Sequence, residues 1–178
     1  QSMILQRSLN QSAADRGASV FHLEDWLHGQ HMILSQNVAA GDVIGHSKGI
    51  ICSNADMHTV QVSATEHVDF RGSGVEYASH SCAPNSRLLV GKEQDGNTET
   101  AYVTLVALVD MKAGDAPSFD YESTEWDMSC PFYCLCGADA CRGHIRGFKY
   151  LEFQEQKQLQ PIASSFIQAT FGAQAGDA

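Results

Sequence analysis

Long hydrophobic runs are absent from this sequence. No apolar stretch approaches the roughly 20 residues that a membrane-spanning helix needs. The apolar stretch near the N-terminus is too short for a secretory signal. These absences predict an intracellular protein with no membrane partner.

Positive charge is also scarce. Lysine and arginine number 11 against 21 aspartates and glutamates, which gives a formal net charge of −10. Nucleic-acid phosphates would be repelled, so we expect no direct binding of nucleic acid. A basic partner, such as a peptide rich in lysine and arginine, would be attracted. Because acidic surfaces also serve solubility alone, charge by itself does not choose between these interpretations.

Internal repeats, low-complexity tracts and a regular alternation of strands and helices are missing too. The short apolar runs, broken by Gly, Asn and Asp, have the length and β-branched content of strands. They cover residues 31–38, 42–47, 58–63, 67–70, 86–91 and 101–109, with a hairpin tip at 93–99. Helical spacing is persuasive only near 149–159, and we expect residues 172–178 to be frayed. The pattern predicts a mostly β protein of small, non-parallel sheets with a short C-terminal helix.

Cysteines are the densest chemical feature that is present. Cys134, Cys136 and Cys141 form a Cys-x-Cys-x4-Cys pattern. Without a secretory signal, such crowding indicates a metal site rather than disulfides. Thiolates this close can share one tetrahedral zinc ion at about 2.3 Å per Zn–S bond, but a closed structural site needs a fourth ligand. The remaining candidates are Cys52, Cys82 and Cys130. Composition does not choose among them.

Three motifs in order resemble a known family. The segment "SHSCAPN" at 79–85 is followed by "SFDYESTEW" and then by "CLCGADACRG". This set is similar to the SET-domain lysine methyltransferases with a post-SET zinc segment, over about residues 21–150. The resemblance implies a SET-domain fold in which residues 79–85 tuck beneath the strand carrying Phe-Asp-Tyr. That arrangement is a pseudoknot, a rare exception to unknotted chains.

The resemblance also implies a reaction and a catalytic pair. The reaction is methyl transfer from S-adenosylmethionine to a lysine amine, usually in a histone tail; a non-histone protein or a small amine stays open. Tyr121 stands at the position of the catalytic tyrosine. Phe119 stands where the family's residue tunes the number of methyl groups added.

Further site residues follow from the same resemblance. The implied zinc ligands are Cys82, Cys134, Cys136 and Cys141. The cofactor contacts that we infer are Gly29, His31, Ser79, His80 and Phe148. For Phe148, a simple contact at the start of the helix is an equally good interpretation.

Two departures from the family pattern fall on the cofactor site. The family has Gly-x-Gly where this chain has Gly29-Gln30-His31, although only glycine admits the closest backbone approach. Ser79 replaces an asparagine, whose amide both donates and accepts. These changes predict weakened cofactor binding. They favour the alternatives of a catalytically silent SET-fold binding or scaffold module, or a repurposed catalyst that does not methylate.

The expected organisation has four parts. They are a leader with vector residues (1–20), the SET domain (21–130), the post-SET zinc segment (131–150) and a C-terminal helix and tail (151–178). Glu125 and Asp127 are candidates to receive a basic peptide. The alternative is that this segment is only a turn stabilised by burial of Trp126.

Overall fold

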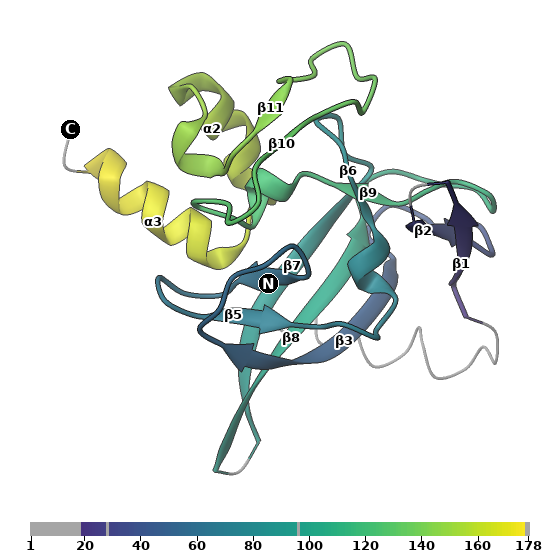
Figure 1. The fold of residues 1–178 in the computed structure, drawn as a ribbon, viewed down its shortest axis with the longest axis horizontal. Helices are drawn as coiled ribbons and strands as arrows, with labels where there is room; N and C mark the ends of the chain where they lie inside the picture. The colour runs from purple at the N-terminus through teal and green to yellow at the C-terminus, as the bar shows by residue number, and fades with distance from the viewer. Residues whose placement is uncertain (1–18, 28, 96, 177–178) are drawn as a thin grey trace.

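Short strands form most of the secondary structure in the computed structural model, which describes residues 19–27, 29–95 and 97–176 (Figure 1). The strands are β1 (Phe21–Trp26), β2 (Gly29–Leu34), β3 (Val43–Cys52), β4 (Thr59–Gln61), β5 (His67–Asp69), β6 (Ser79–His80), β7 (Ser86–Asp95), β8 (Thr98–Ala107), β9 (Ser118–Phe119), β10 (Phe132–Tyr133) and β11 (His144–Ile145). The helices are α2 (Phe153–Leu159) and α3 (Ser165–Gly176), with the 3-10 helices η1 (Val75–Tyr77), η2 (Tyr121–Ser123), η3 (Phe148–Tyr150) and η4 (Gln160–Ile162). The predicted mostly β fold of small sheets is confirmed.

The largest sheet has five antiparallel strands in the order β4-β5-β3-β8-β7. It curves, and the β7–β8 hairpin extends away from the body (Figure 1). The main core packs on this sheet, where Val68, Leu88, Val103 and Leu105 are fully buried. Glycine is required at Gly49, because a Cβ atom there would lie 2.3 Å from Cγ1 of Val68. These five strands match runs that the sequence predicted.

A parallel pair of two-residue strands, β6 and β9, joins segments that are far apart in the sequence. Asn85, the last residue of the "SHSCAPN" segment, fixes this pairing through its side-chain amide. Its Nδ2 donates to the carbonyl of Ala116 at 2.9 Å, and its Oδ1 accepts from the N–H of Ser118 at 2.7 Å. The pairing is the one expected of the pseudoknot, and it brings His80 beside Phe119.

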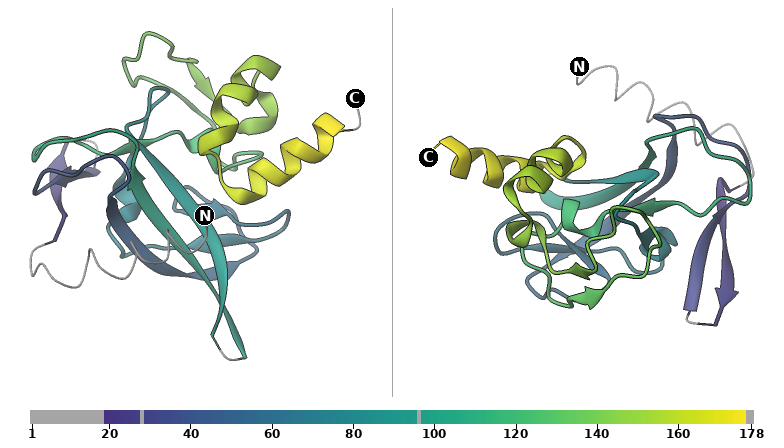
Figure 2. Two further views of the ribbon diagram at one scale, coloured as in Figure 1. Left: turned by 180° about the vertical axis from the view of Figure 1, so that it is seen from behind. Right: turned by 90° about the horizontal axis from the view of Figure 1, so that it is seen from above.

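The β1–β2 hairpin stands to one side of the main sheet (Figure 2). Strand β1 was not predicted, whereas β2 overlaps the run predicted at 31–38 but begins at Gly29 and ends at Leu34. Phe21 attaches the hairpin to the body. Its ring fills the space beside Gly45 and Gly74, where an added Cβ atom would lie 3.2 Å and 2.8 Å from ring carbons. The hairpin carries Gly29 and His31, so its attachment positions part of the candidate site.

The C-terminal part forms a second, smaller core around the fully buried side chains of Phe148 and Ile167. Helices α2 and α3 pack over this core and follow the short β10–β11 pair (Figure 2). The helix predicted at 149–159 begins only at Phe153, because residues 148–150 form η3 instead. Helix α3 was not predicted. It continues to Gly176, so the expectation that residues 172–176 are frayed is wrong.

Residues 1–18 of the expected leader lie outside the described residues. The division at residues 20, 130 and 150 stays a prediction. Within the described part of the chain, no helix is both long and apolar enough to span a membrane.

Candidate active site and metal centre

Phe119 and Tyr121 lie side by side where β9 ends and η2 begins. Their ring centroids are 4.8 Å apart. The phenol hydroxyl of Tyr121 donates to the backbone carbonyl of Ala78 at 3.0 Å, which fixes the ring across the chain crossing. Burial raises the pKa of Tyr121 to about 12. The phenol therefore keeps its proton at neutral pH.

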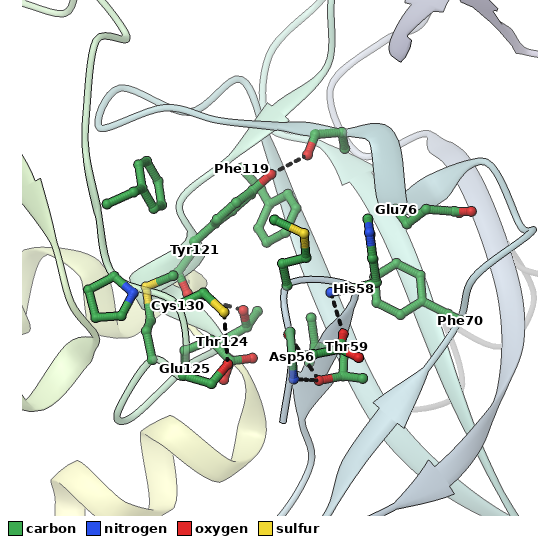
Figure 3. A pocket seen from close by; sticks show the side chains of 17 residues that line it. Asp56, His58, Thr59, Phe70, Glu76, Phe119, Tyr121, Thr124, Glu125 and Cys130 are labelled. Carbon is green, nitrogen blue, oxygen red and sulfur yellow. Dashed lines mark hydrogen bonds between the residues drawn. The ribbon is translucent and has the colours of Figure 1, made fainter. Parts of the chain in front are cut away.

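These two rings line a cavity of about 420 Å³. Figure 3 shows Tyr121 and Phe119 on one side of it, with His58 and Glu76 on the other. Much of the wall is apolar, from residues such as Met57, Phe70, Met128 and Phe132. The charged lining residues are all acidic: Asp56, Glu76 and Glu125. Among the described residues, no lysine or arginine lines this cavity, so its electrostatic preference is for a cation.

Residues 124–127 show features of both alternatives, a segment that receives a basic peptide and a turn stabilised by burial of Trp126. Glu125 lines the cavity and is buried, with Oε1 accepting from the N–H of Gln61 at 2.8 Å. Burial raises the pKa of Glu125. Asp127 is instead exposed and paired with Lys149 at 2.6 Å. Trp126 is partly buried, with its ring stacked on that of Phe148.

Four cysteine side chains, three of them from residues 134–141, meet at one place. The Sγ atoms of Cys82, Cys134, Cys136 and Cys141 all lie within 4.8 Å of one another. In a tetrahedral site with bonds of about 2.3 Å, sulfur atoms are separated by about 3.8 Å. The Cys82 and Cys134 sulfurs are 3.9 Å apart. The donor set therefore fits a zinc ion with little movement.

The surroundings of these sulfurs also suit a metal. Burial raises the pKa of the Cys82 thiol to about 12 and that of the Cys134 thiol to about 11, whereas N–H groups of the backbone lower the pKa of Cys136 to about 6. The N–H of Arg142 donates to Cys82 Sγ at 3.5 Å, and the N–H of Cys136 donates to Cys134 Sγ at 3.4 Å. A divalent cation would stabilise the thiols of Cys82 and Cys134 as thiolates.

Cys52 and Cys130 lie outside this group. The Cys52 thiol donates to the carbonyl of Asn54 at 3.4 Å, and Cys130 is exposed. The choice of Cys82 that the family resemblance implied is thus the one that the geometry brings to the cluster. Zinc binding itself stays a prediction.

A buried ionic network, which sequence reasoning missed, attaches residues 134–142, here called the metal segment, to the "SFDYE" motif at 118–122. The Arg142 side chain donates to the carboxylates of Asp120 at 2.6 Å and Glu122 at 2.8 Å. The other oxygen of Glu122 accepts from the backbone N–H groups of Arg146 and Gly147. The available signal was acidic residues flanking Tyr121 and an arginine directly after Cys141. Spacing alone does not pair them.

Two of the predicted cofactor residues contact each other. His31 Nδ1 and Ser79 Oγ are 3.3 Å apart, so the two departures from the family pattern form one hydrogen-bonded pair. The ring of Trp26 packs against His31, with centroids 4.9 Å apart. Gly29 has a φ of 124°, and no atom lies within 4 Å of the position of a Cβ there. Gly29 is exposed, and several other glycines have equally open space, so its role at the cofactor stays a prediction, whereas His31 and Ser79 satisfy one another.

The other two predicted cofactor residues, Phe148 and His80, have different surroundings. The Phe148 side chain is fully buried in the second core, between Trp126 and Phe171. Its role at an adenine stays a prediction, although no face of its ring is exposed. His80 directs its imidazole toward Tyr121 and Cys82. Burial and the nearby Arg142 charge lower the pKa of His80 to about 4, so the ring is neutral at pH 7.

Comparisons with known proteins find methyltransferases among the chains that are similar in sequence. No protein-family model matches the chain. Methyltransferase flvH of Aspergillus flavus is 35% identical over 80 residues, which cover 45% of this chain and 40% of that protein. The histone-lysine N-methyltransferases, H3 lysine-4 specific, of Aspergillus oryzae and Emericella nidulans are each 32% identical over 76 residues, covering 42% of this chain and 6% of theirs. The chain therefore spans less than half of the length of these relatives.

Among solved structures, a Plasmodium falciparum protein described as a histone methyltransferase has a TM-score of 0.47 at 13% identity. The match covers 57% of this chain and 96% of that one. The sequence relatives are methyltransferases, two of them specific for a histone lysine. These names agree with the resemblance to methyltransferases that the three motifs indicated.

Proposed function

We propose that this protein transfers a methyl group from S-adenosylmethionine to the side-chain amine of a lysine in a basic protein or peptide. The observation that carries the proposal is the pair Phe119 and Tyr121 in the wall of an acidic cavity. The pair lies next to the parallel β6–β9 pairing, which joins the two segments that resemble the family's motifs. The cofactor would supply a methyl group made electrophilic by a sulfonium charge. The family resemblance implies that Gly29 lies beside this cofactor.

The cavity suits the two demands that an amine nucleophile makes. A lysine ammonium, with a pKa near 10.4 in water, must be attracted as a cation and then react as a neutral amine. Glu76 and the overall charge of −10 favour attraction, whereas Asp56 is already paired with Arg71 at 3.2 Å. The apolar surroundings of Phe119 and Phe132 disfavour the charged form and lower the amine's pKa.

Tyr121 would orient the nucleophile rather than act as a base. Its hydroxyl proton is used in the hydrogen bond to Ala78, and its oxygen keeps lone pairs that can accept from the amine. Fixed geometry of this kind lowers the entropic part of the barrier. The high pKa of the phenol agrees with a positioning role.

The four cysteines would hold Zn²⁺ as a structural ion with no open position. The ion would fix the segment that runs from Cys134 to Cys141, and Arg142 would hold that segment to the "SFDYE" motif. Histone-type substrates would place the protein in the nucleus, and other proteins would place it there or in the cytoplasm.

The test combines binding and turnover. Calorimetric titration with S-adenosylmethionine should show binding, and labelled methyl should pass into members of a panel of basic peptides. The variant Tyr121→Phe removes only a hydroxyl, so its fold and cofactor affinity should persist. Loss of a positioned hydrogen-bonding group costs about a hundredfold or more in rate. An equally active phenylalanine variant would overturn the mechanism.

The His31–Ser79 contact is the one observation that favours a silent binding module, because both groups already have a partner in the predicted cofactor site. If the wild-type protein neither binds S-adenosylmethionine nor transfers methyl across the panel, that alternative replaces the enzyme.

A further inference from the structure

One histidine lies between the metal cluster and the catalytic tyrosine and contacts both. The N–H of Tyr121 donates to His80 Nδ1 at 3.2 Å. The other ring nitrogen, Nε2, is 3.4 Å from the sulfur of Cys82. The His80 side chain is 4% exposed, so water offers neither nitrogen much competition.

The hydrogen-bond network fixes the tautomer of this ring. Nδ1 accepts the Tyr121 N–H and therefore carries no proton. A neutral imidazole has one donor and one acceptor nitrogen, so the proton is on Nε2 and points at Cys82 Sγ. The same sulfur also accepts the N–H of Arg142 at 3.5 Å. Two N–H donors thus converge on one of the four candidate metal ligands.

Aromatic contacts hold the ring in this orientation. His80 packs edge-to-face on Tyr121, with centroids 5.2 Å apart, and on Phe132, with centroids 5.5 Å apart. Tyr121 and Phe132 both line the acidic cavity. The carboxylate of Asp120 lies 3.9 Å from Nδ1, and Arg142 covers that carboxylate at 2.6 Å. Rotation of the imidazole would break contacts on both sides at once.

We propose that His80 is a positioning residue that joins the zinc site to Tyr121. Through Nε2–H it stabilises the Cys82 thiolate, and through Nδ1 it fixes the backbone of the residue that orients the substrate amine. This inference rests on the proposed function, because it takes Cys82 as a zinc ligand and Tyr121 as the catalytic tyrosine. Hydrogen-bonding partners of metal ligands typically change metal affinity or activity by about 10- to 100-fold.

Two variants separate the two halves of the proposal. In His80→Asn the side-chain amide reaches only the level of Nδ1, so it can accept from Tyr121 but cannot reach the sulfur. In His80→Gln the amide reaches the level of Nε2, so it can donate to the sulfur but leaves the Tyr121 N–H without its acceptor. Each variant is the matched control for the other.

The readouts do not depend on turnover. Cobalt(II) in place of zinc gives a thiolate-to-metal charge-transfer band that responds to hydrogen bonds on sulfur, and competition with a chelator gives zinc affinity. Exchange of the Tyr121 amide proton, followed by NMR, reports its bond to Nδ1. His80→Asn should shift the band and weaken zinc binding about tenfold while keeping amide protection. His80→Gln should keep the band and the affinity while losing protection and slowing methyl transfer.

Variants that change both readouts alike, or neither, would overturn the inference and leave His80 as a packing residue. Circular dichroism checks that each variant is folded. A wild-type protein that shows the band and the protected amide but no methyl transfer would count against the proposed function alone.

Discussion

The network of Arg142, Asp120 and Glu122 allows one substitution to be worked out in detail. Their side chains are 14%, 0% and 2% exposed, and the arginine binds both carboxylates through separate nitrogens. Arg142→Met would keep much of the side-chain volume and leave two buried carboxylates without their cation. Removing one partner of a buried pair costs about 3–5 kcal/mol, against a total stability of roughly 5–15 kcal/mol for a domain.

The assay is urea unfolding followed by circular dichroism, with Lys149→Met as the matched control. Lys149 also pairs with a carboxylate, that of Asp127, but the two side chains are 34% and 52% exposed. The control should lose less than about 1 kcal/mol. Arg142→Lys should fall between them, because one ammonium cannot reproduce a fork that serves two carboxylates. If Arg142→Met unfolds at the same urea concentration as Lys149→Met, the network does not hold the metal segment and the reasoning fails.

Three further outcomes are expected. Folded protein washed with a weak chelator should keep one zinc per chain; Cys82→Ser should lower that ratio and Cys52→Ser should not, as elemental analysis would show. The double variant His31→Gly with Ser79→Asn should bind S-adenosylmethionine more tightly than the wild type. Calorimetry of the single and double variants should show a coupling free energy above about 0.5 kcal/mol between the two positions. Strictly additive effects would contradict the contact between the two side chains. The rate of methyl transfer should rise between about pH 7 and pH 10 as the lysine amine loses its proton, because Tyr121, with a pKa near 12, stays protonated over that range. If the rate fell above about pH 9 while the protein stayed folded, the phenol would be losing its proton at a lower pH than expected.

The strands of the main sheet were predictable because each buries one apolar face, which leaves a pattern in the residues themselves. Strand β1 was not predictable, since it pairs with β2 alone among the described strands and four of its six residues are exposed. Helix α3 was missed for a related reason. Its stability comes from tertiary burial of Ile167 and from the Ser164 hydroxyl, which accepts the Ile167 N–H, rather than from a strong periodic pattern. A helix that is stabilised mainly by tertiary contacts has little helical periodicity in its own sequence.

The candidate site shows the same limit. The family resemblance carried by the three motifs implied Cys82, which the structure brings to the cysteine cluster, and Tyr121, whose catalytic role stays a prediction. The side-chain partners were not predictable. Arg142 meets Asp120, and His80 meets Tyr121, only after the β6–β9 pairing has formed. Such contacts depend on tertiary geometry, which no spacing in one sequence encodes.

The His31–Ser79 contact changes how the departures from the family pattern are understood. Taken singly, a histidine in place of glycine adds bulk, and a serine in place of asparagine removes a donor. Taken together, each side chain provides the hydrogen-bond partner of the other. A change at either position therefore removes the hydrogen-bond partner of the other side chain. A ligand lying along Gly29 must therefore either accept this pair as part of its site or break a contact that the free protein already has. The free-energy cost of breaking this contact would be subtracted from cofactor binding, and the cycle of wild-type, single and double variants measures the coupling between the two side chains.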